Sequence, residues 1–86
     1  MDGRAAARLG EHGEAVAALE RALDLDKQLG LPRKIALDLI ALAEVEIARG
    51  DRTAARDYAR RALAVSRAGG GKRQQDEAQR LLESIP

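Results

Sequence analysis

Apolar residues recur at intervals of three and four in every long segment of the chain, and nowhere do they alternate strictly with polar residues. Such spacing places apolar side chains on one face of an α-helix. The first long segment carries Ala15, Ala18, Leu19, Ala22, Leu25 and Leu29 at these intervals, and a later segment carries Ala55, Tyr58, Ala59, Ala62 and Val65. The pattern therefore predicts an all-α protein built from amphipathic helices.

The segment from Pro32 to Arg49 carries two apolar stripes side by side. One contains Ile35, Leu39 and Leu42, and the other contains Ala36, Ile40, Ala43 and Ile47. An apolar sector this wide is typical of a helix packed on two sides, so we expect this to be the central helix. The last segment has only a narrow stripe (Ala78, Leu81, Leu82 and Ile85), which predicts a lid helix over one side of the core.

Glycines divide the chain at four places: Gly10 with Gly13, Gly30 with Leu31-Pro32, Gly50-Asp51, and residues 69–71. Proline is accepted in a first helical turn, so Pro32 predicts a helix start. Gly50 suits the left-handed residue that ends a helix, and Asp51 suits the N-cap of the next one.

The chain also repeats itself at an offset of 40 residues. The matched pairs are Gly10/Gly50, Glu11/Asp51, Ala15/Ala55, Arg21/Arg61, Ala22/Ala62, Leu23/Leu63, Gly30/Gly70 and Arg33/Arg73. A repeat of this length with glycines at the helix ends indicates stacked helical hairpins. We expect a single domain over residues 1–86, with a first repeat in 1–30 whose opening helix is truncated, a second repeat in 31–70, and a capping helix in 72–85.

These residues resemble the tetratricopeptide repeat. The second repeat fills the family pattern with Leu39, Leu42, Ala43, Gly50-Asp51, Ala55 and Ala62-Leu63, and the first with Gly3, Gly10-Glu11, Ala15, Leu19 and Ala22-Leu23. The extended second helix is similar to the long repeats of bacterial transcriptional regulators and signalling ATPases. The chain departs from the pattern at Glu46, near a usual aromatic position, at Ala59, which replaces a bulky residue, and at Lys27 and Arg67, where proline is common.

The resemblance implies antiparallel helical hairpins, a fragment of an α-solenoid, closed by a C-terminal lid. It also implies a non-catalytic module that binds a protein or peptide partner on its concave side. The residues expected to line that groove are Arg4, Arg8, Leu37, Ile40, Ala41, Glu44, Glu77 and Arg80. The competing interpretation is that Leu37 and Ile40 are core residues.

The amino-acid composition limits the kinds of functional site that the chain can form. The 86 residues include no cysteine and one aromatic residue, Tyr58, so the core must be made of aliphatic side chains and no cysteine-based site exists. His12 is the one histidine and is expected to be a solvated turn residue, while the glycines before Lys72 lack the other residues of a phosphate-binding loop. We therefore expect no enzymatic activity, no metal and no cofactor.

Charge is divided unevenly along the chain, although its net charge is only +1. Residues 11–29 hold five acidic against two basic side chains, and residues 49–67 hold six arginines against two aspartates. Arg49, Arg52, Arg56, Arg60 and Arg67 could line one helix face and bind nucleic acid, but compensation by the acidic helix is the favoured interpretation. No apolar run is long enough to span a membrane and the start lacks a secretory core, which predicts a cytoplasmic location.

The preferred hypothesis is thus a protein-interaction module or scaffold within a larger bacterial-type regulatory protein. The alternatives are a structural homo-oligomerisation domain and, third, a small nucleic-acid-binding domain. Because the opening helix before Gly10 is short, we expect Val16, Leu19 and Leu23 to be left uncovered and to hold a homodimer together through the N-terminal hairpin.

Overall fold

Residues 2–85 form four α-helices and one short irregular turn before the last helix. The computed structural model describes the backbone of residues 2–85 and the side chains of residues 11–69 and 71–85. The elements are α1 (Asp2–Leu29), α2 (Pro32–Arg49), α3 (Arg52–Val65), the turn η1 (Ser66–Gly70) and α4 (Lys72–Ser84). Residues 2–85 contain no strand, which confirms the all-α fold class.

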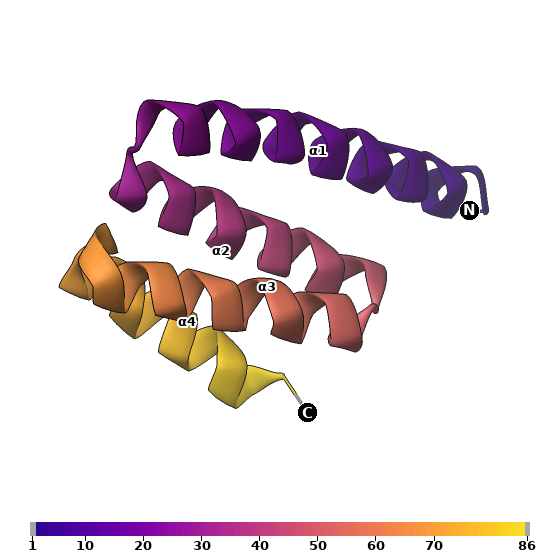
Figure 1. The fold of residues 1–86 in the computed structure, drawn as a ribbon. Helices are drawn as coiled ribbons and strands as arrows, with labels where there is room; N and C mark the ends of the chain where they lie inside the picture. The colour runs from indigo at the N-terminus through magenta and orange to yellow at the C-terminus, as the bar shows by residue number, and fades with distance from the viewer. Residues whose placement is uncertain (1, 86) are drawn as a thin grey trace.

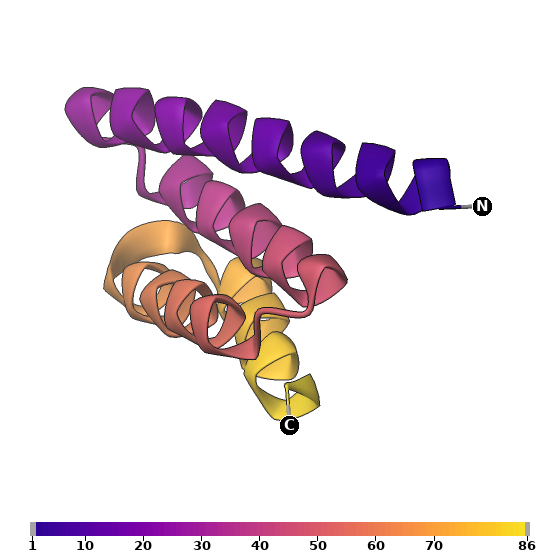
Figure 2. The ribbon, with the colours of Figure 1, turned by 90° about the vertical axis from the view of Figure 1, so that its right-hand side faces the viewer.

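Helix α2 lies at the centre of the molecule. Figures 1 and 2 show α1 on one side of it and α3 with α4 on the other, and α2 contacts all three helices. Its two apolar stripes account for this position, because Ala36 and Ile40 are buried along with Leu39, Leu42 and Ala43. The prediction of a central helix packed on two sides is confirmed.

Three residues determine where α2 begins and ends and where α3 begins. Pro32 occupies the first turn of α2, where its missing N–H group costs nothing. Gly50 ends α2 with φ of 85°, and its amide donates to the Ile47 carbonyl at 3.0 Å. The Asp51 carboxylate then accepts a hydrogen bond from the Ala54 amide at 3.0 Å, so it caps α3 as expected.

The core is made of leucines surrounded by alanines. Leu39 and Leu42 are the largest side chains that are fully buried, and Ala55, Ala59, Ala62 and Ala78 are completely covered. Since alanine has no side chain beyond Cβ, the helices can approach closely at these points. A core without phenylalanine or tryptophan is therefore filled by close helix packing.

Helix α1 differs from the prediction. A break at Gly10 and Gly13, with a truncated opening helix in residues 1–30, is wrong, because α1 runs without interruption from Asp2 to Leu29. A glycine inside a helix costs only about 1 kcal/mol, so it does not force a break. Gly50 is followed by an aspartate that caps the next helix, whereas Gly10 is followed by Glu11, a poor N-cap residue.

The burial of the apolar side chains of α1 also differs from the prediction. Leu23 is only 4% exposed and belongs to the core under α2, with Val16 and Leu19 half-buried beside it. The prediction that Leu23 is uncovered is therefore wrong, because α2 packs against that face of α1. By contrast, Leu25 and Leu29 are 54% and 60% exposed.

Candidate partner-binding groove

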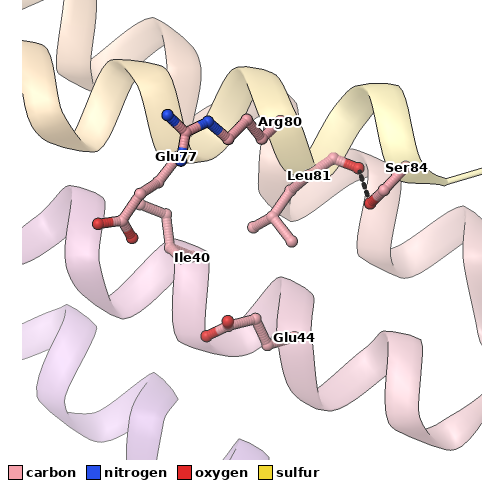
Figure 3. Close-up of a pocket in the computed structure, with 6 residues that line it drawn as sticks. All are labelled: Ile40, Glu44, Glu77, Arg80, Leu81 and Ser84. Atoms are coloured by element: carbon pink, nitrogen blue, oxygen red, sulfur yellow. Dashed lines mark hydrogen bonds between the residues drawn. The ribbon is translucent and has the colours of Figure 1, made fainter.

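A pocket of about 290 Å³ lies between α2 and α4. Figure 3 shows its lining, with Ile40 and Glu44 on α2 facing the residues that α4 contributes. Those residues are Glu77, Arg80, Leu81 and Ser84. The pocket is thus formed by two helices that are not adjacent in the chain.

Helical periodicity brings these side chains to one place. Glu77, Leu81 and Ser84 are separated by four and three residues, so they share one face of α4. Ile40 and Glu44 are four residues apart and share one face of α2. The Ser84 hydroxyl donates to the Leu81 carbonyl at 2.9 Å, which holds it against its own helix (Figure 3).

The pocket has an apolar floor and a charged rim. Ile40 is 4% exposed and Leu81 is half-buried, so together they form an aliphatic floor. Glu44 and Arg80 are exposed and Glu77 is half-buried. Two carboxylates and one guanidinium therefore surround a surface that can accept an apolar side chain.

A second, larger hollow continues along α4. It measures about 650 Å³ and is lined by Lys72, Arg73, Asp76, Glu77 and Arg80. Because it shares Glu77 and Arg80 with the first pocket, the two are neighbours on one surface. Basic residues prevail toward the start of α4, whereas the acidic Glu44 and Glu77 stand at the first pocket.

The structure brings together four of the residues that the sequence assigned to the groove: Ile40, Glu44, Glu77 and Arg80. Leu37 and Ala41 lie on α2 outside the pocket, with Leu37 43% exposed and Ala41 half-buried. The side chains of Arg4 and Arg8 lie outside the described residues. The buried Ile40 shows that the core interpretation also holds for that residue, which serves both the core and the pocket floor.

Leu81 and Ser84 were missed as groove residues. Leu81 was assigned only to the narrow apolar stripe of the lid, and Ser84 was not singled out. Their spacing from Glu77 contains the signal, because residues four and seven positions after a groove residue lie on the same helix face.

A hydrogen bond between side chains joins α3 to α1. The Tyr58 hydroxyl donates to the Glu20 carboxylate at 3.0 Å, and the Arg61 guanidinium lies 5.6 Å from the centre of the Tyr58 ring. Burial raises the pKa of Tyr58 above its usual value, and the acceptor Glu20 adds to the effect. The only aromatic side chain of the protein thus acts as a brace between helices.

Glu46 stands near a position where the repeat pattern usually has an aromatic residue, and its local contacts explain how the structure accommodates it. Its side chain is buried, with 5% of the residue exposed, and one carboxylate oxygen lies 3.2 Å from the Arg49 guanidinium. This oxygen has an ion-pair partner but no hydrogen bond of good geometry. Arg49, a member of the arginine series, is therefore directed at an acid of its own helix.

Two aspartates face each other between α1 and α2. Asp38 interacts with Asp26, and its Oδ2 atom is covered and has no hydrogen-bond partner among the described residues. Burial, followed by the neighbouring Asp26, raises the pKa of Asp38 from 3.8 to about 6, although Lys34 opposes the shift. Two ionised carboxylates can only repel, so a proton on one turns this contact into a hydrogen bond.

His12 is not the solvated turn residue expected. It lies within the continuous helix α1 and is half-buried, with Nδ1 covered and without a hydrogen-bond partner among the residues whose side chains the structure describes. Among residues 11–69 and 71–85, no three histidine, cysteine or acidic side chains gather in a way that could hold a metal ion. No helix in the described part of the chain is both long and apolar enough to cross a membrane.

The comparisons with known proteins identify one family. The family model of the tetratricopeptide repeat matches residues 3–68, which include nearly all of α1 and the whole of α2 and α3. No curated protein and no solved structure matches the chain.

Proposed function

Because the chain belongs to the tetratricopeptide repeat family, whose repeats generally mediate protein–protein interaction, we propose that it is a non-catalytic module that holds a protein segment in the pocket between α2 and α4. The observation that supports this most strongly is the meeting of Ile40, Glu44, Glu77 and Arg80 around one pocket. All four are residues that the resemblance to the tetratricopeptide repeat assigns to the groove.

The residues that line the pocket determine which side chains of a bound protein segment it favours. Ile40 and Leu81 favour an aliphatic side chain, which gains free energy by leaving water. Glu44 and Glu77 favour a basic group beside it, and Arg80 can pair with a carboxylate in a bidentate manner. We therefore expect a peptide with one apolar anchor flanked by a basic residue.

The proposal extends to the setting of the module. Its internal repeat of about 40 residues is similar to the long repeats of bacterial regulators, which supports a role inside a larger regulatory or scaffold protein in the cytoplasm. We assign no nucleic-acid partner, since Arg49 is paired with Glu46 and Arg61 lies over Tyr58. These contacts support intramolecular compensation of the basic segment.

Selection of peptides from a random display library against the full chain tests the proposal. The selected peptides should carry an apolar anchor next to a basic residue, and their affinity should fall about tenfold or more in the double variant Glu44→Lys, Glu77→Lys. Asp57→Lys makes a similar charge reversal at an exposed position on α3 and should leave the affinity unchanged. Peptides that bind the double variant as well as the original chain would refute the groove assignment.

A further inference from the structure

The segments that lead into α2 and α4 carry basic side chains and no acidic ones. Residues 30–37 and residues 66–75 contain no aspartate or glutamate. Their basic residues are all exposed, and they are Arg33, Lys34, Arg67, Lys72 and Arg73. Among the described residues, no carboxylate lies at ion-pair distance from any of the five. Their charge is therefore available to a ligand.

The two segments meet at one end of the molecule. A Cβ atom added to Gly69 would lie 3.8 Å from Cγ of Pro32, and one added to Gly71 would lie 3.6 Å from Nε of Arg33. Figure 1 shows that α2 and α4 start at the same end. A hollow of about 370 Å³ lies there, and it is lined by Leu31, Pro32, Arg33, Lys34 and Gly69. We call the five basic residues of these segments the basic end.

Both helices start at the basic end without a side-chain cap. Leu31 precedes α2 and Gly71 precedes α4, and neither supplies a side-chain hydrogen bond to the helix that follows. The first turns of the two helices also lack acidic residues. The first amides of a helix have no carbonyl partner within it, and the helix dipole gives them a partial positive charge. The backbone therefore favours an anion at the same place as the side chains do.

The buried side chain of Gln74 is directed at the start of α4 and lacks a partner. Gln74 is 7% exposed, and its carboxamide forms no hydrogen bond with a described residue. Its Oε1 atom lies 2.8 Å from the point where a Cβ of Gly71 would stand, beside the Arg33 guanidinium. A half-turn of the carboxamide places the donor Nε2 there in the same volume. Because buried polar groups normally have a partner, an anion between Gln74 and Arg33 would supply the missing one.

We propose that the basic end binds a phosphoryl group on the protein segment that the pocket between α2 and α4 holds, an inference that rests on the proposed function. A phosphorylated side chain carries about two negative charges and three acceptor oxygens, which suit guanidinium, ammonium and amide donors. The hollow of about 650 Å³ along α4 connects the two places. Lys72 and Arg73 line it together with Glu77 and Arg80 of the pocket.

The geometry of α4 sets the spacing between the two parts of the bound segment. Arg73 at the basic end and Leu81 at the pocket floor lie eight residues apart, which is about 12 Å at the rise of an α-helix. An extended peptide covers this distance with about four residues. We therefore expect the phosphorylated residue about four positions from the apolar anchor.

Acidic side chains adjoin the basic end and limit what can bind there. Asp38 follows Lys34 by one turn of α2, and Asp76 follows Lys72 by one turn of α4. Asp76 and Glu77 also line the hollow along α4. A nucleic acid would bring its further phosphates against these carboxylates, whereas a single phosphoryl group meets the basic side chains alone. The charge pattern thus favours one phosphorylated side chain over a polyanion.

Fluorescence anisotropy with labelled peptides tests the proposal. A peptide selected from the display library is synthesised unmodified and with a phosphoserine at the expected spacing before or after its apolar anchor. One phosphorylated form should bind about tenfold or more tighter than the unmodified peptide. This gain should vanish in the double variant Lys72→Gln, Arg73→Gln. The double variant Arg52→Gln, Arg60→Gln removes the same charge from exposed positions on α3 and should retain the gain.

The two proposals fail in different ways. If phosphorylation adds no affinity, or if the gain survives in Lys72→Gln, Arg73→Gln, the phosphoryl site is overturned while the pocket assignment stands. If the unmodified peptide binds Glu44→Lys, Glu77→Lys as well as it binds the original chain, the pocket assignment fails instead.

Inorganic phosphate tests the basic end without any peptide. Titrated into the isotopically labelled chain at constant ionic strength, it should shift the backbone amides of residues 71–74 and the side-chain amide of Gln74 in NMR spectra, while chloride should not. An absence of these shifts overturns the proposal. An affinity for inorganic phosphate equal to that for the phosphorylated peptide also overturns it, because the site would then serve a free anion.

Discussion

Alanine is the residue on which the packing of this protein depends. Ala55, Ala59 and Ala62 of α3 have no exposed surface, because residues of α2 and of the C-terminal segment that includes α4 pack against them. A larger side chain at such a position must push the helices apart or adopt an unfavourable rotamer. The absence of phenylalanine and tryptophan from the sequence is matched by this close approach of helices.

Replacement of Ala62 by leucine should lower the free energy of unfolding by about 1–3 kcal/mol through overpacking. Ala64→Leu is the matched control, because Ala64 lies on the same helix but is exposed. Urea denaturation followed by circular dichroism measures both changes. An unchanged midpoint for Ala62→Leu would show that α2 does not pack against this position.

Asp26 and Asp38 make stability depend on pH. In the folded chain the pKa of Asp38 is about 6, compared with 3.8 for an ordinary aspartate. Between these two values the folded chain retains a proton that the unfolded chain has released, so the contribution of this group to stability falls as the pH rises. It is fully present below about pH 4 and is lost above about pH 6.

Asp38→Asn should therefore make the protein more stable at pH 7 by about 1 kcal/mol, a value reduced from the full shift because solvent screens the pair. The advantage should shrink toward pH 4, where Asp38 is protonated in the original chain, while the exposed Asp57→Asn should behave like the original at both values. Thermal melts across this pH range measure the difference. An Asp38→Asn advantage that is the same at pH 4 and pH 7 would contradict the proton-sharing contact.

At the scale of the elements, glycine continues one helix and ends another. Gly13 lies inside α1 with helical geometry, and a Cβ added there would meet no atom within 4 Å. Gly50 ends α2 with φ of 85°, a conformation that other residues adopt at a cost of about 1 kcal/mol or more. The identity of a glycine therefore does not decide whether a helix ends there.

Gly13→Ala should raise the free energy of unfolding by about 1 kcal/mol, because alanine favours the interior of a helix. Gly50→Ala should lower it by a similar amount, since alanine is strained at a positive φ. Chemical denaturation of the two variants provides the comparison. If Gly13→Ala were destabilising, the chain would have to reverse direction near that residue, and the continuity of α1 would be wrong.

The sequence predicts much of this fold because its signals are local. The stripes of α2 and α3, the start at Pro32 and the cap at Asp51 all depend on residues a few positions apart. The continuity of α1 was not predicted, because it depends on a small difference between two cap residues, Glu11 and Asp51. Likewise the repeat pattern predicts an uncovered Leu23, since it does not show how far α2 extends over α1.

The sequence predicts part of the groove, again because helical periodicity is a local signal. Ile40 and Glu44 follow from the face of α2, and Glu77 and Arg80 from the face of α4. The separation of Leu37 from the pocket depends on where α4 crosses α2, which is a tertiary relation without a local signal. Periodicity assigns residues to faces, and only the packing of the helices determines which faces meet.

At the scale of the whole molecule, α2 separates two different surfaces. One is the pocket that α2 forms with α4, where apolar and charged side chains alternate. The other is the face of α1 that carries Leu25 and Leu29, both of which are exposed.

The central claim is that the pocket between α2 and α4 is the partner-binding site. Chemical-shift mapping by NMR tests this claim most directly. A selected peptide is titrated into the isotopically labelled chain, and backbone amide shifts are followed for every assigned residue. The account predicts that the largest changes cluster in residues 37–44 of α2 and 77–84 of α4, while α3 is little affected. Changes concentrated on the exposed face of α3 or on α1, with residues 77–84 unmoved, would contradict it.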